Sequence, residues 1–239
     1  MTIATAARPH LWRRLAAEFL GTGLLVAIVI GSGIAASCLS PYDIGLQLLE
    51  NSVATALGLT VLILVLAPVS GAHFNPVVTL ADWWLGRRTG HLPLVDVAGY
   101  VVAQILGGLG GAALANTMFE TATSFSTTER VAGGHLVGEV VATAGLVLVI
   151  FALARTRRGH IVAPAVGAYI GAAYWFTSST SFANPAVTIG RIFSDTFAGI
   201  APASVLPFIG MQLAGGLVGI LLVVLFFPTT RPPAAPRLA

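Results

Sequence analysis

Two short stretches place an Asn-Pro pair inside strongly hydrophobic sequence. They are AHFNPVVT at 72–79 and TSFANPAV at 180–187, and Asn184 follows Asn75 by 109 residues (184 − 75). Asn caps free backbone N–H groups and Pro suits the first helical turn, so each pair predicts a helix start. Inside a membrane, the two Asn amides could also donate hydrogen bonds to water or to a neutral solute.

Other residues that could do chemistry are scattered. The sequence has no Ser-His-Asp, paired-carboxylate or phosphate-loop pattern, and its five His and single Cys show no metal-ligand spacing. Because Cys38 is alone, the chain forms no internal disulfide. We therefore expect no enzymatic activity, no cofactor and no metal site.

The composition is that of an integral membrane protein. The chain has 239 residues, 56% hydrophobic and 9% charged, with a mean hydropathy of +0.90, whereas soluble domains carry about 25% charged residues. Several apolar segments reach the roughly 20 residues that a helix needs to cross a bilayer, and none alternates like a barrel strand. We expect an all-α membrane protein with six spans, at about 11–36, 50–67, 93–115, 134–154, 161–178 and 203–227.

Arginine placement predicts the orientation. All twelve basic residues are Arg, and the side of the membrane that holds most of them is cytoplasmic. With six spans, Arg130 and Arg191 fall on one side, and the other side holds Arg8, Arg13, Arg14, Arg87, Arg88, Arg155, Arg157, Arg158, Arg231 and Arg237. Both termini are therefore expected in the cytoplasm. The arginines flank the spans in small groups, so no nucleic-acid partner is expected.

The two halves of the chain match each other. AEFLGT at 17–22 corresponds to GEVVAT at 138–143, and QILGGLGG at 104–111 corresponds to QLAGGLVG at 212–219. Each half holds three spans, and an odd number of crossings inverts the second copy in the membrane. We expect one membrane domain, 1–239, with inverted repeats at about 11–115 and 134–227 and a Pro-rich tail at 228–239.

The segment after each Asn-Pro pair is too short to cross the bilayer, since a span needs roughly 20 residues. Irregular backbone at membrane depth persists only where protein buries it or where it lines a wet cavity. We expect two re-entrant half-helices whose N-termini meet at the midplane, where their partial positive charges repel cations and protons. Carbonyl groups of 69–74 and 178–183 would accept hydrogen bonds from a passing hydroxyl.

Together these features resemble the aquaporin family, also called major intrinsic proteins. The spans, the inverted repeat, SGAHFNP, SFANPAVT and the paired QxxGG segments cover essentially the whole chain. The resemblance implies a homotetramer in a lipid bilayer, with one pore per subunit for water or small neutral solutes. It assigns the pore motifs to Asn75, Pro76, Val77, Asn184, Pro185 and Ala186. Val77 stands where the family usually has Ala, a small enlargement expected beside the pore.

Two carboxylates lie inside expected spans, where an uncompensated charge is costly. By the resemblance, Glu18 and Glu139 accept hydrogen bonds from the re-entrant loops and hold the pore backbone, a role that we favour over a proton relay. His73 precedes the first motif and is expected to contribute its carbonyl and ring to the cytoplasmic half of the pore. Its titration could also gate the pore with pH.

The usual arginine of the outer constriction is missing. Three residues after the second Asn, where the family has Arg, stands Val187. Arg191 follows one helical turn later and is expected to lie too far into the outer vestibule to replace it. Aligning ALGLT at 56–60 with the family's second span assigns the selectivity neck to Leu57, Tyr174, Ser181 and Val187.

The neck alignment has an alternative. The assignment above requires a two-residue gap before each motif, and we favour it because it treats both halves alike. Without the gaps, Thr55 and Ala172 take the second-span and fifth-span positions.

An uncharged neck favours larger, less polar solutes over single-file water. Val in this position, within AAYWFTSSTSFANPAV at 172–187, resembles bacterial aquaglyceroporins associated with arsenic resistance. We expect a passive channel in a bacterial inner membrane for glycerol-like polyols, undissociated metalloid acids such as arsenite, and water. A secondary transporter would normally place carboxylates beside Asn75 or Asn184, and none is visible there. A water-only or closed homologue is permitted by the bulk of Leu57 and Tyr174.

Overall fold

The computed structural model describes residues 8–87 and 92–228, and these residues form helices and connecting loops with no strand. The helices are α1 (Leu11–Leu39), α2 (Ile44–Ser70), α3 (Pro76–Gly86), α4 (Leu94–Met118), α5 (Gly133–Arg155), α6 (Val162–Phe176), α7 (Pro185–Gly190) and α8 (Pro202–Phe226), with 3₁₀ turns η1 (Gly159–Ile161) and η2 (Arg191–Phe193). The all-helical prediction is confirmed.

Five helices are long and apolar enough to cross a membrane: α1, α2, α4, α5 and α8. The fifth expected span, 161–178, is shorter as a helix, because α6 has 15 residues and begins only after the η1 turn. It ends where Thr177 adopts extended backbone and the chain turns back into the molecule. The five long apolar helices make the protein a multi-pass membrane protein, and η1 with α6 occupies the place of the fifth expected span.

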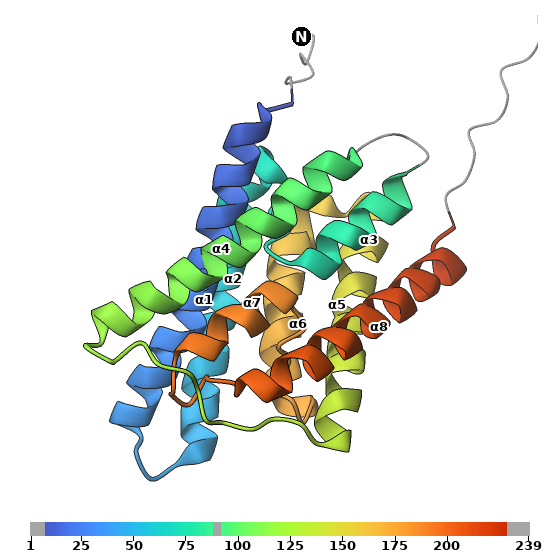
Figure 1. Ribbon diagram of the computed structural model, residues 1–239. Coiled ribbons are helices and arrows are strands. Elements are labelled where there is room, and N and C mark those ends of the chain that lie inside the picture. The colour runs from blue at the N-terminus through green and yellow to red at the C-terminus, as the bar shows by residue number, and fades with distance from the viewer. Residues whose placement is uncertain (1–7, 88–91, 229–239) are drawn as a thin grey trace, which may run out of the picture.

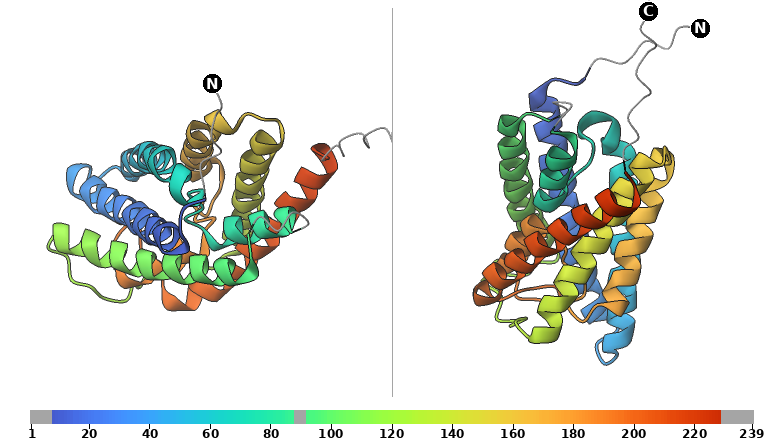
Figure 2. Two further views of the ribbon diagram at one scale, coloured as in Figure 1. Left: turned by 90° about the horizontal axis from the view of Figure 1, so that it is seen from above. Right: turned by 90° about the vertical axis from the view of Figure 1, so that its right-hand side faces the viewer.

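The two halves of the chain form two similar helix groups. In the first, α1 packs along α2 and α4; in the second, α5 packs along α6 and α8. The groups meet where α2 packs against α6. Figure 1 shows α3 and α7 leaving the centre of the molecule in opposite directions, as an inverted repeat requires. The start of α1 and the end of α8 lie at the same end of the molecule (Figure 2).

Glycines allow the long helices of each half to touch. A Cβ atom on Gly107 or Gly111 of α4 would collide with backbone atoms of α1. A Cβ on Gly215 or Gly219 of α8 would lie 2.6 and 2.7 Å from carbonyl oxygens of α5. The paired QxxGG segments therefore bring α4 against α1 and α8 against α5, by close small-residue contact of the kind that joins membrane helices.

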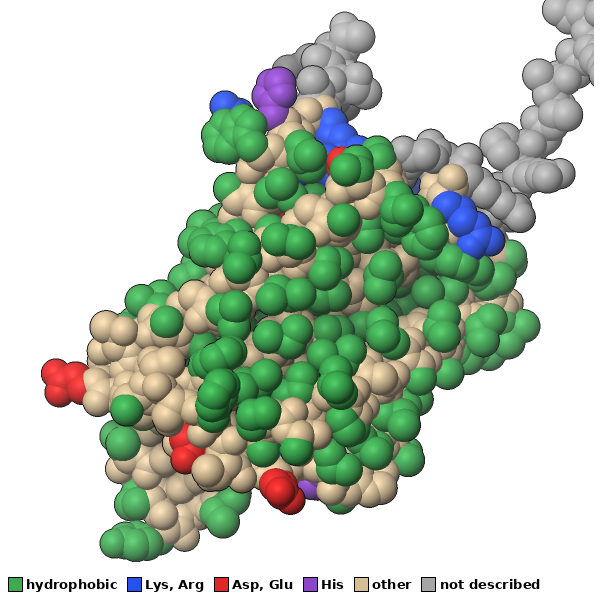
Figure 3. All heavy atoms as spheres, in the orientation of Figure 1, with side chains coloured by type: hydrophobic (Ala, Val, Ile, Leu, Met, Phe, Trp, Pro, Cys, Tyr) green, Lys and Arg blue, Asp and Glu red, His purple; other side chains and the backbone are tan. Residues whose placement is uncertain are grey.

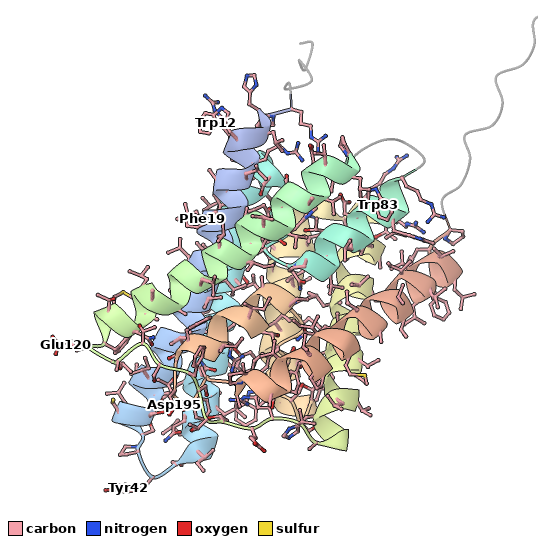
Figure 4. The ribbon with its side chains drawn as sticks, in the orientation of Figure 1. Trp12, Phe19, Tyr42, Trp83, Glu120 and Asp195 are labelled. Atoms are coloured by element: carbon pink, nitrogen blue, oxygen red, sulfur yellow. The ribbon has the colours of Figure 1, made fainter. Side chains whose placement is uncertain are left out.

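The surface is apolar between two polar ends. On the face in Figure 3, arginine side chains gather at the upper end and most carboxylates at the lower end. Trp12 and Trp83 lie at the upper end, and Tyr42, Glu120 and Asp195 at the lower end (Figure 4). Large apolar side chains such as Leu217 and Leu221 are exposed between the ends, as lipid-facing side chains must be. Arg88, Arg231, Arg237 and residues 229–239 of the Pro-rich tail lie outside the described residues.

Candidate functional site

Two irregular loops enter the centre of the molecule, one before α3 and one before α7. Their backbones follow the same path, because positive φ angles occur at equivalent positions 109 residues apart. The pairs are Gly71 (95°) with Thr180 (60°), Ala72 (51°) with Ser181 (52°), and Phe74 (50°) with Ala183 (48°). Left-handed backbone is unfavourable for residues other than Gly, so each loop needs strong support from its surroundings.

The two motif asparagines cap their helices and join the loops. The side-chain oxygen of Asn75 accepts from the Val77 N–H at 2.9 Å, and that of Asn184 accepts from the Ala186 N–H at 3.0 Å. The Asn75 amide nitrogen donates to the Ala183 carbonyl at 2.7 Å. The Asn184 amide nitrogen donates to the Phe74 carbonyl, also at 2.7 Å. An amide NH₂ has two donors, so each Asn keeps one N–H beyond this reciprocal pair.

Glu18, fully buried in α1, holds the first loop. One carboxylate oxygen accepts from the Ser70 hydroxyl at 2.6 Å and the His73 N–H at 3.0 Å. The other accepts from the Phe74 N–H at 2.7 Å and the Gln104 amide at 2.8 Å. Both oxygens therefore have protein donors, which compensates the buried charge.

Glu139, fully buried in α5, holds the second loop in the same way. It accepts from the N–H groups of Phe182 and Ala183, both at 2.9 Å, and from the Gln212 amide at 2.6 Å. Phe182 and Ala183 occupy the repeat positions of His73 and Phe74. Two matched carboxylate clamps thus fix the two loops, each from the first helix of its own repeat.

A glutamine and a threonine complete each clamp. Gln104 donates to the Thr79 hydroxyl at 2.9 Å, and Gln212 donates to the Thr188 hydroxyl at 2.8 Å. Each hydroxyl in turn donates to the backbone carbonyl of the motif Asn, four residues earlier. The conformation of each half-helix start is therefore tied to its carboxylate through side chains of α4 or α8.

A narrow cavity of about 60 Å³ passes between the two loops. Its apolar lining residues include Leu25, Val29, Leu59, Leu146, Val166 and Ile170. The polar lining residues are Thr55, His73, Asn75, Tyr174, Ser181, Asn184 and Arg191. The cavity therefore offers both apolar contact and hydrogen-bonding groups to whatever occupies it.

A wide vestibule of about 590 Å³ adjoins the cavity at the end where α1 begins. The two spaces share Ala72, His73 and Val78 among their lining residues, so they lie next to each other. The His73 ring lies where they join, with Nδ1 3.1 Å from the Thr79 hydroxyl and Nε2 3.8 Å from an Asp82 carboxylate oxygen.

Three of the four expected neck residues line the narrow cavity: Tyr174, Ser181 and Val187. The placement of Leu57 in the neck is wrong, because its side chain is 65% exposed on the outer surface of α2. Thr55 is 2% exposed, lines the cavity, and its hydroxyl lies 3.2 Å from the Tyr174 hydroxyl. For α2, the alignment without the two-residue gap therefore places the lining residue correctly. For α6, the alignment with the gap does so, because Ala172 is exposed.

Arg191 also lines the cavity, so the expectation that it lies too far outside is wrong. Its side chain is 3% exposed, and its guanidinium carbon lies 3.5 Å from the centre of the Phe182 ring. The reason is local: α7 ends at Gly190, and the η2 turn directs Arg191 inward. The passage therefore contains a charge that the predicted neck lacks.

Val77 does not enlarge the passage. Its side chain is buried against α8, where a Cβ atom on Gly216 would collide with it, and it is absent from the cavity lining. The extra methyl groups therefore fill space between α3 and α8. The remaining motif residues lie as their types predict, with Pro76 and Pro185 as the first residues of α3 and α7.

Phe182 is a lining residue that the sequence reasoning missed. It lies two residues before Asn184, as His73 lies two residues before Asn75, so the repeat itself carried the signal. Its ring is packed edge-on against Phe208, with ring centres 5.3 Å apart.

Comparison with known proteins finds that this chain is similar to aquaporins and aquaglyceroporins. The sequence model of the major intrinsic protein family matches residues 5–181. An aquaglyceroporin, AqpS of Rhizobium meliloti, is 45% identical over 93% of this chain and 93% of its own length. Aquaporin Z of Photorhabdus laumondii is 32% identical over 87% of this chain and 94% of its own length. The crystal structure of the Plasmodium falciparum aquaglyceroporin covers 91% of this chain and 96% of its own, with a TM-score of 0.65 and 23% identity, and supports the fold.

Proposed function

Since the chain belongs to the major intrinsic protein family, we propose that its passage carries glycerol-like polyols and undissociated metalloid acids such as arsenite. The coarser activity, a passive membrane channel for water and small solutes, follows from the family and the named relatives. Members of the family are transport proteins, and we propose that this chain catalyses no reaction.

The observation that carries the proposal is the mixed apolar and polar lining of the cavity. A polyol has a hydrocarbon skeleton and several hydroxyl groups, so it can contact apolar lining residues such as Leu25 and Leu146 while its hydroxyls bond the polar lining residues. Among the polar lining residues, Asn75 and Asn184 each keep one N–H after their bonds across the loops. Hydroxyl groups meeting these donors replace the water that the solute loses.

Metalloid acids present the same chemistry. As(OH)₃ is neutral at pH 7 and about the size of glycerol, so a passage that accepts three glycerol hydroxyls also suits three arsenite hydroxyls. The relative AqpS is named an aquaglyceroporin, and a shorter match, 35% identical over 50% of this chain and 43% of its own length, is a propanediol uptake facilitator of Salmonella typhimurium. These names support small hydroxylated solutes as the substrate class.

The roles of individual residues follow from this proposal. Asn75 and Asn184 orient the solute at the centre, and Glu18 and Glu139 keep the loops in place. The narrow part of the passage is formed by Thr55, Tyr174, Ser181 and Val187. Small uncharged groups at Thr55, Ser181 and Val187 leave room for a solute larger than water.

We also propose the setting of the channel. The chain forms one membrane domain that assembles as a homotetramer in the bacterial inner membrane. The arginine-rich end, with Arg13 and Arg87 beside exposed Trp12 and partly buried Trp84, faces the cytoplasm by the positive-inside rule. The wide vestibule is then the cytoplasmic mouth, and the cavity beside Arg191 opens outward.

The test is stopped-flow light scattering on proteoliposomes that reswell in an inward glycerol gradient. Native protein should reswell faster than empty vesicles, and Val187→Arg should lose this flux because a long side chain fills the narrow part. Val187→Ala is the matched control, since it keeps the position small and uncharged, and it should retain glycerol flux.

Arsenite uptake into the same vesicles follows the glycerol result. Absence of glycerol reswelling in vesicles that contain folded, water-conducting protein would contradict the polyol proposal.

A further inference from the structure

Two arginines approach one aromatic ring at the outer side of the passage. The Arg191 guanidinium carbon lies 3.5 Å from the Phe182 ring centre, and that of Arg130 lies 5.1 Å from it. The loop after α7 holds both: the Ala198 carbonyl accepts from Arg191 Nε, and the Gly199 carbonyl accepts from Arg130 Nε at 2.6 Å. Stacking on a ring and bonding to carbonyls fixes the direction of each guanidinium.

Arg191 differs from Arg130 in the hydrogen bonds of its terminal guanidinium nitrogens, Nη1 and Nη2. Arg130 Nη2 donates to the Phe197 carbonyl at 2.9 Å. No described residue accepts from Nη1 or Nη2 of Arg191, although the side chain is 3% exposed and lines the cavity. An arginine has five N–H donors, so four of them remain for whatever occupies the passage.

The charge of Arg191 is also left without an ion-pair partner among the described residues. The ionisable groups that interact with it electrostatically are Arg130, Tyr174 and Glu139. The Glu139 carboxylate bonds the loop N–H groups and Gln212, and it forms no ion pair with either arginine. The outer part of the passage is therefore positive, and Arg191 is the cation that touches its lumen.

We propose that Arg191 is the specificity-determining residue of this channel's outer constriction. Because its side chain lines the cavity, it supplies the positive charge that Val187 does not supply. It donates hydrogen bonds to the oxygen atoms of small neutral polyhydroxy solutes and repels monovalent cations. This inference rests on the proposed function, because it names how the passage distinguishes hydroxylated solutes from others. The solutes that it favours carry several hydroxyl groups on a small uncharged centre, and protonated amines are excluded.

The repeat gives an independent reason to single out this position. Seven residues after each motif Asn stands a charged residue, Asp82 in the first half and Arg191 in the second. Each lies against the residue two before its Asn, Asp82 beside His73 at 3.8 Å and Arg191 over Phe182 at 3.5 Å. The two mouths of the passage thus carry opposite charges at equivalent positions.

The test compares Arg191→Met with native protein in two assays. Proteoliposome reswelling gives the permeability ratio of glycerol to 1,2-propanediol, which has the same three-carbon skeleton and one hydroxyl fewer. Because one hydrogen bond contributes about 1 kcal/mol, the ratio should fall roughly fivefold in the variant. Planar bilayers should show an ammonium current that the native protein lacks.

Arg155→Met is the matched control. Arg155 donates to carbonyl groups of Val223 and Phe227 at the other end of the molecule and is absent from the cavity lining. It should keep the native solute ratio and carry no ammonium current. Folded Arg191→Met with both properties unchanged would overturn the inference.

Arg191→Lys keeps the test decisive if the methionine variant does not fold. A lysine retains the charge but not the planar set of donors, so cations should stay excluded while the glycerol preference falls. An unchanged preference would overturn the claim that Arg191 donates to the solute. The proposed function fails separately, when native protein carries water but no glycerol, and the ammonium current of Arg191→Met then decides the role of the charge.

Discussion

The two mouths of the passage are built on the same frame and carry different chemistry. In each half a buried Glu, a Gln and a Thr hold a left-handed loop and a capping Asn, with matching partners and similar distances. Outside this frame the halves diverge. The first opens into a vestibule of about 590 Å³ beside His73 and Asp82, whereas in the second Phe182 and Arg191 line the cavity of about 60 Å³.

This difference between the halves indicates which positions can change the selectivity of the passage. The carboxylates and hydroxyls of the frame are buried and hydrogen-bonded, so a change there leaves polar groups without partners and disturbs the passage as a whole. Asp82 and Arg191 lie outside this frame. Asp82 contacts the first loop through the side chain of His73, and Arg191 contacts the ring of Phe182 and the Ala198 carbonyl of the next loop. Their charges can therefore differ while both carboxylate clamps stay intact. The half-helices differ as well, since α3 has 11 residues whereas α7 has six and continues as a 3₁₀ turn.

The largest expected effect comes from breaking the frame. Glu18→Gln and Glu139→Gln should both lower the melting temperature of the purified protein and its glycerol flux, because an amide presents an N–H where a carboxylate oxygen accepted a bond. The cost is about 1–3 kcal/mol for each buried donor left unpaired. The two variants should lose similar amounts, since the two clamps match.

Glu50→Gln is the control for these variants, because Glu50 contacts the Ser40 hydroxyl outside both clamps. It should melt close to the native temperature. Solute accumulation driven by a pH gradient in native protein, and lost in Glu139→Gln, would instead assign that carboxylate to proton transport.

The next effect tests which face of α2 lines the passage. Thr55→Phe should reduce glycerol flux strongly, because the added ring occupies the cavity beside Tyr174; a barrier higher by 1.4 kcal/mol reduces the rate about tenfold. Leu57→Phe adds a ring two residues away, on the exposed side, and should leave the flux unchanged. Reswelling rates of the two variants measure this, and the reverse order would restore Leu57 to the neck.

A smaller effect is expected where α8 meets α3. Gly216→Ala should destabilise the protein by about 1–3 kcal/mol through overpacking, since the new methyl group meets the Val77 side chain. Val77→Ala in the same chain should recover most of the loss by making room. The melting temperatures of the two single variants and the double variant measure this coupling, and strictly additive losses would show that the two residues do not compete for space.

The smallest effect lies in the loop after α7. Asp195 accepts from the Thr127 N–H at 2.9 Å and the Thr127 hydroxyl at 3.1 Å, and these bonds lower the pKa of its carboxyl group. A lowered folded-state pKa means that the bonds stabilise the loop above the ordinary pKa, near 4, and that this stability is lost as pH falls through the folded value.

Hydrogen exchange of residues 120–132 should therefore be slower in native protein than in Asp195→Asn at pH 7. The two proteins should converge at acid pH, where the native carboxyl group is protonated. Equal exchange at pH 7 would show that the Thr127 contact does not order the segment.

Features encoded over a few adjacent residues were predictable from the sequence. The Asn-Pro pairs marked the starts of α3 and α7, and the repeated motifs marked two inverted halves. Glu18 and Glu139 stood out because charged residues inside a span are costly, although their role on the loops was expected from the family resemblance. Each of these signals depends on residue type and local order alone.

The errors concern the direction of side chains around a helix. Successive residues of an α-helix are about 100° apart, so a two-residue shift turns a position by about 200° and exchanged inward Thr55 for outward Leu57. Arg191 was misplaced because a half-helix was extended past Gly190, where the chain changes to a 3₁₀ turn of three residues per turn. Val77 was misplaced because its neighbour in space, Gly216, lies in the other half.

The central claim is that solute crosses passively between the two capped half-helices. The most direct measurement is glycerol flux into native proteoliposomes as a function of concentration, temperature and an imposed pH gradient. The account predicts flux that rises linearly with concentration, depends weakly on temperature and ignores the pH gradient. Saturating flux that accumulates glycerol at the expense of a proton or ion gradient would contradict it and identify a secondary transporter.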